Sequence, residues 1–439
     1  MLLADRLEKM MLDVLDAIIE RYDRDPGYPF IDTKLSLPSG RDFGDADPWY
    51  TRRGTIYPWI QGRGLEALAG HRAWLADCPL LTPDQRRARR RKLKTMISEI
   101  AGNMERLRRK NHGRLFFLMT PEGTLLRMNE RGVAEPVDPV PGAANYSDLF
   151  YSKGLMAAAE ALGDDRLARR AERYFRRVVA AILNETFITD QQMFDPKNPV
   201  LAVPGKRLQG IKMIALGGTA LGMRVGDRDF WERRAIALIR RIFRYHIAAA
   251  DGAGLRRFDY WEAVDPEGRP WLDRGRLICD PGHTLEFVGL SLKNLPRFRS
   301  RAGRRLAAEL RPCYAAFLRH QFENGYAAGP GGIIKAFDLL SRTPVNTDMP
   351  WWSLPETIRA AALAIDFTGD ESLKTIISTC ADAFFGGYVR PACHSRAVQT
   401  RDAAGEVVSV IPATPDVDPG YHTNLSLIDA LPVIRRLKL

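Results

Sequence analysis

Amphipathic helical segments alternate with very short turns along this sequence, and the alternation leaves few folds open. Apolar residues recur at the spacing of one helix face in about twelve segments. Three of the turns between them read Gly-Asp, at residues 163–164, 226–227 and 369–370. A glycine there can take the left-handed conformation that ends one helix, and the aspartate can cap the next helix. The expected helices cover residues 2–22, 61–76, 83–109, 146–163, 166–185, 208–224, 228–247, 283–294, 301–322, 353–367, 370–384 and 422–436.

Helix pairs that repeat about six times predict an all-α ring, the (α/α)6 barrel or six-hairpin toroid. In such a ring each hairpin buries its apolar face against its neighbours, so one core runs around the whole chain. We therefore expect a single domain over residues 1–439, with no linker. Residues 115–128 have the pattern of a small β-hairpin that turns at Pro121-Glu122-Gly123. Long loops, which are usually functional, are expected at 186–207, 251–282, 323–352 and 385–421.

The composition is that of a soluble globular protein, with 45% hydrophobic and 27% charged residues. No stretch approaches the roughly 18 apolar residues of a membrane span, so we expect no membrane partner and a cytoplasmic location. The five cysteines are scattered and lack Cys-x-x-Cys spacing, which argues against a disulfide framework and a zinc site. The net charge of +12 comes from basic residues within helical patterns, typical of solvated helix faces. We expect no nucleic-acid partner, although a basic surface favours anionic substrates.

One helix start carries a histidine and a glutamate three residues apart. The segment 281–286 reads PGHTLE, and residues i and i+3 share a helix face, so His283 and Glu286 can point into one cavity as a base and its orienting partner. Taken alone, such a pair is more often a solvated or capping pair. A second Pro-Gly turn delivers His422 to another helix start, and only these two of the seven histidines have this setting. The other five are expected on the surface or in packing.

Two further helix starts combine polar and aromatic groups. The first runs from Tyr57 to Arg63 and reads YPWIQGR. The guanidinium of Arg63 is suited to donate to sugar hydroxyls or to a developing oxyanion, and a surface salt bridge is the alternative. At the second start, Asn145 is a candidate substrate contact. A simple helix N-cap is at least as good an interpretation for that residue.

A tandem tryptophan pair precedes another helix start, in the segment WWSLPE at 351–356. The indoles of Trp351 and Trp352 can stack on the apolar faces of sugar rings, whereas a packing role in the core is the alternative. The carboxylate of Glu356 can accept from hydroxyls or tune an imidazole. Tandem tryptophans in a loop favour the binding role.

Six segments along the chain carry a common pattern when taken in order: WIQGR at 59–63, GRLFFLMTPEGTLLRM at 113–128, NYSDLF at 145–150, PGHTLE at 281–286, WW followed by Glu356, and YH at 421–422. Together these motifs resemble the N-acylglucosamine 2-epimerase family, a group of (α/α)6-barrel sugar epimerases and aldose–ketose isomerases. The resemblance covers most of the chain. It departs from the family after the last histidine, where Thr423-Asn424 replaces Val-Pro-Arg, and at Lys212-Met213, where only the methionine of a Pro-Met element is kept.

The resemblance implies a set of roles. His283 and His422 would be the acid/base pair, supported by Glu286 and Glu356. Arg63 would bind near the reacting carbonyl and Trp352 would line the sugar pocket. The full set of expected substrate contacts is Arg63, Trp352, Trp351, Tyr57 and Asn145.

The expected activity is that of a sugar 2-epimerase. A ring-opened N-acylhexosamine or related aldose would lose and regain the C2 proton through an enediolate, for which the imidazole pKa near 6.5 is suited. If a histidine reaches only one face of the sugar, the proton goes to C1 instead. The enzyme is then an aldose–ketose isomerase for a mannose-type or anionic sugar. Two further functions stay open, namely a glycosidase or lyase that uses Glu286 and Glu356 as paired carboxylates, and a non-catalytic sugar-binding protein. We expect no cofactor and no metal, and a homodimer stays open.

Overall fold

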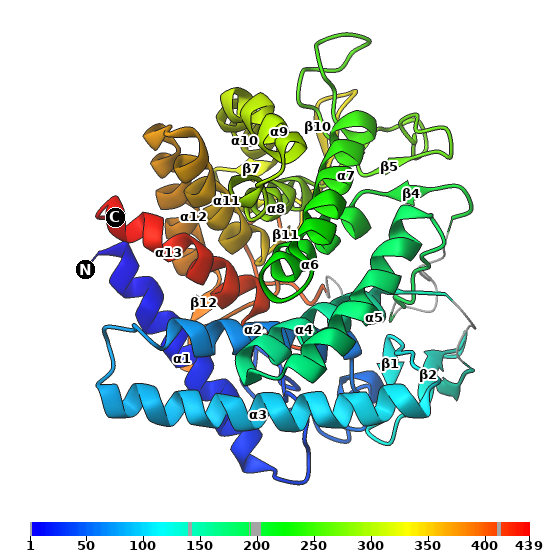
Figure 1. The fold of residues 1–439 in the computed structure, drawn as a ribbon, viewed down its shortest axis with the longest axis vertical. Helices are drawn as coiled ribbons and strands as arrows, with labels where there is room; N and C mark the ends of the chain where they lie inside the picture. The colour runs from blue at the N-terminus through cyan, green and yellow to red at the C-terminus, as the bar shows by residue number, and fades with distance from the viewer. Residues whose placement is uncertain (1, 139–142, 193, 195–202, 411–413) are drawn as a thin grey trace.

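The computed structural model describes residues 2–138, 143–192, 194, 203–410 and 414–439, and it forms two rings of helices (Figure 1). Six inner helices contact one another in circular order: α2 (Pro58–Trp74), α4 (Tyr146–Leu162), α6 (Gly210–Val225), α8 (Pro281–Leu292), α11 (Ser353–Thr368) and α13 (Ser426–Arg436). The outer helices are α1 (Leu3–Arg24), α3 (Pro83–Lys110), α5 (Asp165–Leu183), α7 (Arg228–His246), α9 (Arg301–Leu310), α10 (Tyr314–Gly325) and α12 (Lys374–Gly387). The predicted α/α toroid is confirmed, and each of the predicted helical segments is helical.

The turns between paired helices differ in their glycine conformation. Gly163 and Gly369 are left-handed, with φ of 69° and 81°, as predicted. Gly226 is extended instead, with φ of −132°, so the prediction of a left-handed cap is wrong there. A Cβ at Gly226 would lie 2.6 Å from the carboxyl carbon of Glu172, so close packing explains this glycine. Asp164 and Asp227 cap the next α-helix through their carboxylates, as when Asp164 accepts from the backbone of Leu167, and Asp370 caps the 3₁₀ turn Glu371–Leu373 directly before α12.

The predicted helix at 301–322 is divided into α9 and α10. A 3₁₀ turn at Arg311–Cys313 separates the two. Pro312 lacks a backbone N–H, and its ring crowds the carbonyl of the preceding helical turn, so a continuous α-helix is interrupted at this point. The helical pattern on either side is otherwise as expected.

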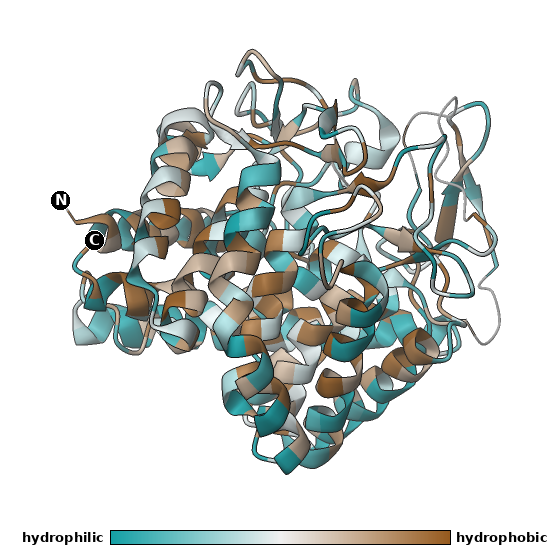
Figure 2. Ribbon diagram, turned by 90° about the horizontal axis from the view of Figure 1, so that it is seen from above, coloured by the Kyte–Doolittle hydropathy of each residue, from teal (hydrophilic) through white to brown (hydrophobic). Residues whose placement is uncertain are grey.

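The long connections carry short strands that gather along one side of the helical body (Figure 2). The predicted hairpin is present as β1 (Leu118–Met119) and β2 (Leu125–Met128), extended by β3 (Ala134–Pro136). The remaining strands pair within the loops: β4 (Arg207–Leu208) with β5 (Ala263–Val264); β9 (Ala336–Asp338) with both β6 (Ile278–Cys279) and β10 (Thr343–Asn346); β7 (Tyr326–Ala327) with β8 (Gly332–Ile333); β11 (Met349–Pro350) with β14 (Thr400–Arg401); and β12 (Val389–Arg390) with β13 (Arg396–Ala397). Residues 193 and 195–202 of the predicted loop 186–207, and 411–413 of the loop 385–421, lie outside the described residues. Among the helices that the structure describes, none is long and apolar enough to cross a bilayer.

Helices α2 and α4 pack backbone to backbone through two glycines. A Cβ at Gly154 would lie 2.2 Å from the carbonyl oxygen of Gly62, and a Cβ at Gly62 would lie 2.5 Å from the carbonyl carbon of Phe150. Backbone atoms on both sides cannot move aside as a flexible side chain can. The contact holds together the two inner helices that contribute Arg63 and Tyr146.

We expect Gly154→Ala to destabilise the protein by about 1–3 kcal/mol, because the added methyl group forces α2 and α4 apart. The measurement is the free energy of unfolding in urea. Gly102→Ala is the matched control, since Gly102 lies in the middle of α3 and no atom lies within 4 Å of the position that a methyl group would take there. The gain in helix propensity should stabilise that variant by about 0.5–1 kcal/mol. Equal effects of the two substitutions would contradict the packing argument.

Candidate active site

A cavity of about 330 Å³ opens at the end of the ring where the inner helices begin. Each inner helix start, or the turn just before it, contributes at least one wall residue. These residues are Trp59 and Arg63 of α2, Tyr146 and Phe150 of α4, Gly210 and Met213 of α6, His283 and Glu286 of α8, Trp352 before α11, and His422 before α13. The sequence motifs that lie far apart along the chain therefore meet around one space.

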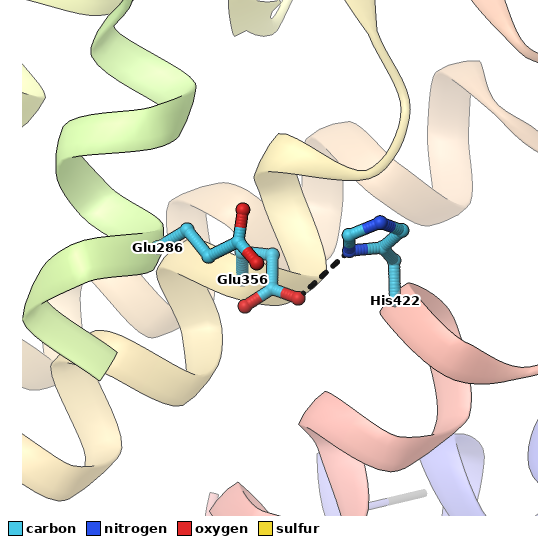
Figure 3. A group of neighbouring side chains, drawn as sticks. All are labelled: Glu286, Glu356 and His422. Carbon is cyan, nitrogen blue, oxygen red and sulfur yellow. Dashed lines mark hydrogen bonds and ion pairs between the residues drawn. The ribbon is translucent and has the colours of Figure 1, made fainter. Parts of the chain in front are cut away.

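His422 is held in a fixed orientation from two directions. It lies in a single π-helical turn, Tyr421–Leu425, directly before α13. The Asp418 carboxylate caps this turn by accepting from the backbone N–H groups of Tyr421 at 3.0 Å and His422 at 3.3 Å. The imidazole Nδ1 lies 2.9 Å from Oε1 of Glu356 (Figure 3). Because a carboxylate can only accept, Nδ1 carries a proton, and in the neutral imidazole Nε2 is then the nitrogen that can act as a base.

Glu356 is wholly buried and supports His422 from behind. Its Oε1 also accepts from the Ser426 hydroxyl at 2.9 Å, and the Arg359 guanidinium donates to Oε2. Burial alone would raise the pKa of Glu356, but Arg359 and His422 outweigh it and lower the pKa. Glu356 is absent from the cavity wall, so within the described residues it acts on His422 and not on a ligand.

His283 is oriented by residues other than the one expected. Its Nδ1 lies 3.1 Å from Glu262 and 3.3 Å from Asp280. Glu286 does not form the expected pair with it, because the carboxylate of Glu286 lies beside Glu356 and His422 instead (Figure 3). Burial alone would lower the pKa of His283, but the charges of Asp280 and Glu262 outweigh it and raise the pKa to about 9. At neutral pH this imidazole therefore carries a proton.

Glu286 is buried and faces the cavity from α8. Burial, and then the negative charge of Glu356 next to it, raise its pKa. A carboxyl group that holds its proton more strongly can donate a hydrogen bond to a sugar oxygen. Its position thus suits ligand binding.

The Trp352 indole is a platform shared by both histidines. Its ring centroid lies 5.6 Å from that of His283 and 5.5 Å from that of His422. Trp351 lines the same cavity. Two imidazoles therefore lie next to the same indole, and Nδ1 of each contacts a carboxylate.

The Arg63 guanidinium faces the cavity among aromatic rings. Its carbon lies 4.2 Å from the ring centroid of Phe150 and 5.5 Å from that of Tyr421. Within the described part of the chain, Arg63 forms no ion pair and its buried Nε has no hydrogen-bond partner. The Arg63 guanidinium is permanently charged and has no carboxylate partner among the described residues, so it is suited to bind an oxygen of a ligand.

Comparison with known proteins identifies the family of the chain. The model of the N-acylglucosamine 2-epimerase (GlcNAc 2-epimerase) family matches residues 155–414, which is more than half of the chain. The chain belongs to the N-acylglucosamine 2-epimerase family. It is therefore an enzyme of the carbohydrate epimerase and isomerase class, as the motifs predict. No curated protein sequence matches the chain significantly.

Solved structures share the fold of this family member. A cellobiose 2-epimerase from Spirochaeta thermophila aligns with a TM-score of 0.66 and 14% identity over 99% of this chain and 98% of its own. A D-mannose isomerase aligns with a TM-score of 0.62 and 15% identity over 96% of this chain and 97% of its own. A family 76 glycoside hydrolase from Bacteroides thetaiotaomicron is more distant, with a TM-score of 0.55 and 12% identity over 98% of this chain and 78% of its own.

Two of the expected substrate contacts do not line the cavity of this epimerase-family protein. Tyr57 is fully buried, and its hydroxyl donates to the carbonyl oxygen of Tyr50 at 2.7 Å. Asn145 is the N-cap of α4, where it accepts from the backbone of Asp148 and donates to the carbonyl oxygen of Leu115. Both residues shape the walls from behind, and the N-cap interpretation holds for Asn145.

Several residues around the two histidines were missed from the sequence. Asp280 and Asp418 each precede a Pro-Gly turn, and the repeated Asp-Pro-Gly before both histidines was a signal that could have identified them. Glu262 and Lys335 come from long loops and have no local motif. Lys335 lines the cavity, and its Nζ lies 2.5 Å from Asp280.

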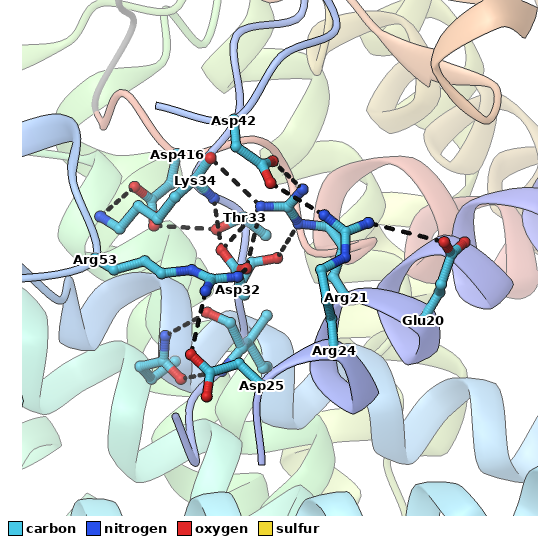
Figure 4. Close-up of polar contacts among 12 residues, drawn as sticks. Glu20, Arg21, Arg24, Asp25, Asp32, Thr33, Lys34, Asp42, Arg53 and Asp416 are labelled. Carbon is cyan, nitrogen blue, oxygen red and sulfur yellow. Dashed lines mark hydrogen bonds and ion pairs between the residues drawn. The ribbon is translucent and has the colours of Figure 1, made fainter. Parts of the chain in front are cut away.

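Asp416 is a further wall residue that the N-terminal region holds in place. Its carboxylate accepts from Lys34 at 2.7 Å and from the Thr33 hydroxyl at 3.0 Å (Figure 4). The same network includes Arg21, which donates to Asp32 at 3.1 Å. The segment that follows α1 thus supports the cavity from outside the inner ring.

Glu286, Glu356 and His422 lie close enough together to suggest a metal ligand set, with ligand atoms within 4.8 Å of one another. Their contacts do not fit a metal. The Arg359 guanidinium donates to Glu356, and the remaining oxygen of Glu356 accepts from His422 and Ser426. A cation at this position would have to displace three hydrogen bonds and lie beside a fixed positive charge, so the group is a positioning network for His422.

Proposed function

We propose that this protein is a sugar 2-epimerase that acts on the open-chain form of an N-acylhexosamine or a related aldose. The observation that carries the proposal is the pair of imidazoles that line one cavity beside Trp352, each with its Nδ1 held by a carboxylate and its Nε2 left for the substrate. Inversion at C2 needs a base on one face of the carbon and an acid on the other. We propose that His422 and His283 take these two roles, each on its own face of C2.

In the proposed mechanism, Nε2 of His422 takes the proton from C2. The electrons of the C–H bond form the C1–C2 double bond of an enediolate, and negative charge develops on the former carbonyl oxygen. The negative charge of Glu356 stabilises the imidazolium that forms on His422. Arg63, without a carboxylate partner among the described residues, stabilises the oxyanion.

His283 then delivers its proton to the opposite face of C2, which restores the carbonyl group and inverts the centre. Its Nδ1 is fixed by Glu262 and Asp280, so the proton on Nε2 is the one that it donates. After turnover His283 is neutral and His422 is protonated. Exchange with solvent resets the pair, and the reverse reaction uses them in the opposite roles.

Two alternatives are less well supported. A glycosidase would need both carboxylates at the substrate, whereas Glu356 is wholly buried behind His422 and does not line the cavity. An aldose–ketose isomerase would use the same enediolate but return the proton to C1. A second, protonated imidazole in the same cavity favours the 2-epimerase, because it can serve as the acid on the other face of C2.

The test is incubation of the protein in deuterium oxide with N-acetylmannosamine, mannose, cellobiose and a uronic sugar, followed by NMR. The proposal predicts a C2 epimer that carries deuterium at C2. A ketose product without the epimer would establish the isomerase instead. The absence of deuterium at C2 of every sugar would contradict proton-transfer chemistry.

Activity should fall as pH rises through about 9, because His283 loses the proton that it delivers. Glu262→Gln removes a carboxylate that raises the pKa of His283, so this limb should move to lower pH by on the order of one unit. The measurement is the pH profile of kcat/KM. Glu267→Gln is the control, since Glu267 is exposed in the same long loop and pairs only with Arg269 among the described residues. An alkaline limb that stays in place in Glu262→Gln would contradict the role of Glu262.

We also propose that residues 1–439 form a single domain, since the contacts between inner helices run continuously from α2 around to α13 and back. A cytoplasmic location is supported by the cysteines, all five of which are free. We propose no nucleic-acid partner for the basic helix faces.

A further inference from the structure

A second cavity, of about 470 Å³, lies beside the candidate active site. We call it the side pocket, and its walls include Phe187, Arg207, Leu208, Ile211 and Lys212. Tyr146 and Gln191 line both cavities. The start of α6 also borders both, since Gly210 faces the active-site cavity and the next two residues face the side pocket. The two cavities therefore lie side by side and share part of their walls.

The side pocket contains a buried lysine without a carboxylate partner. Lys212 is only 8% exposed, and its Nζ donates to the carbonyl oxygen of Leu208 at 3.3 Å. Among the residues that the structure describes, no carboxylate forms an ion pair with this ammonium group. A buried ammonium group lowers stability unless an opposite charge compensates it. An ammonium group in a cavity wall without such a charge is available to bind an anion.

The surroundings of Lys212 are predominantly positive. Glu185, the one acid that the described residues place on this wall, forms its ion pair with Arg207 at 2.5 Å. Arg241 lines a neighbouring cavity that Lys212 also borders, and it donates to the carbonyl oxygen of Leu183 at 2.8 Å. Burial lowers the pKa of Lys212 to about 8, with Glu185 opposing and Arg241 and Arg207 adding to the shift. Positive charge thus exceeds negative charge around the ammonium group, which is the condition that a bound anion relieves.

We propose that the side pocket binds an oxyanion, a carboxylate or phosphate group, carried by the sugar whose C2 lies in the neighbouring cavity. Lys212 is the anchor, and it is the third residue of α6, so the positive end of that helix's dipole lies next to it. Charge-assisted hydrogen bonds to such a group fix the end of the sugar that does not react. The inference rests on the proposed epimerase function for the sugar, but oxyanion binding itself does not.

The first test is calorimetric titration of the full chain with inorganic phosphate. The wild-type protein should bind phosphate, and Lys212→Met should bind at least about tenfold more weakly. Lys374→Met is the matched control, because it removes one positive charge from the exposed start of α12 and should change nothing. Absence of phosphate binding by the wild-type protein, or equal binding by Lys212→Met, would overturn the proposal.

Thermal unfolding supplies a second readout. Without phosphate, Lys212→Met should unfold at the same or a higher temperature than the wild-type protein, because a buried charge is removed. Added phosphate should raise the unfolding temperature of the wild-type protein only. Lys212→Gln serves the same purpose if the methionine variant does not fold. A stabilisation by phosphate that persists in these variants would place the anion elsewhere and overturn the site.

The last arm identifies the source of the anion. We expect Lys212→Met to lower kcat/KM for a hexose 6-phosphate or a uronic sugar at least about tenfold, and to leave the matching neutral hexose unchanged. An equal effect on charged and neutral sugars would overturn the sugar-borne anion and assign phosphate binding to a separate molecule. If phosphate binding depends on Lys212 but no sugar is turned over, the oxyanion site is supported and the proposed epimerase function fails.

Discussion

His422→Asn is expected to lower the rate of proton removal from C2 by about 10²–10⁴-fold, because no other described residue places a free ring nitrogen at this position. Asparagine keeps an N–H group near Glu356, and that carboxylate still accepts from Ser426 and Arg359. The protein should therefore fold normally. The measurement is deuterium incorporation at C2 in deuterium oxide, together with the yield of the C2 epimer.

His283→Asn should behave differently, and the difference tests the assignment of roles. This variant should lose inversion while it keeps exchange at C2, because His422 can return a proton to the face from which it took one. His112→Asn is the control, since His112 is exposed and has a φ of 52°, which asparagine tolerates. If His283→Asn lost exchange and His422→Asn kept it, the roles would be reversed. Epimerisation by both variants would contradict the two-histidine mechanism.

The fold was predictable because its signals are local. Helix periodicity, the Asp164 and Asp227 caps and the Pro-Gly turns before His283 and His422 all operate within a few residues. Pairs of such helices have few ways to bury their apolar faces, so the toroid follows from their number and short turns. The predicted helix at 301–322 lacked the interruption at Pro312, although a proline inside a helical pattern is a local signal for one.

The site was only partly predictable, because its electrostatics depend on long-range contacts. The sequence offers Glu286 as the partner of His283 at i+3, but the structure supplies Glu262 from 21 residues away. Residues i and i+3 share a helix face, yet they need not point at each other when one of them is drawn toward Glu356. Tyr57 lies outside the cavity wall for a related reason. Its place directly before the WIQGR motif is visible in the sequence, but its burial depends on how the loops fold over it. The helical periodicity of the sequence does not determine such long-range contacts.

Arg359→Met is expected to have the largest effect on stability, a loss of about 3–5 kcal/mol in the free energy of unfolding. Arg359 and Glu356 are both almost completely buried, and the guanidinium donates directly to the carboxylate. Without it, Glu356 keeps its hydrogen bonds to His422 and Ser426 but has no fixed positive charge beside it. The measurement is urea unfolding at pH 7, monitored by circular dichroism.

Arg436→Met is the matched control for this effect. Arg436 pairs with Asp366 at 2.5 Å on the surface, where both side chains are about half exposed. Solvent screens such a pair, so its loss should cost no more than about 1 kcal/mol. A similar small cost for Arg359→Met would contradict the view that Glu356 depends on this guanidinium.

The pH dependence and a double substitution give two independent checks on the same interaction. Arg359 lowers the pKa of Glu356, so its removal should raise that pKa. Because the destabilisation comes from the charged carboxylate, it should shrink as pH falls and Glu356 becomes protonated. For the same reason Glu356→Gln combined with Arg359→Met should be more stable than Arg359→Met alone, since a neutral amide needs no counter-charge. A double variant no more stable than the single one would mean that Arg359 stabilises the ring through packing, and that the negative charge behind His422 is held by other groups.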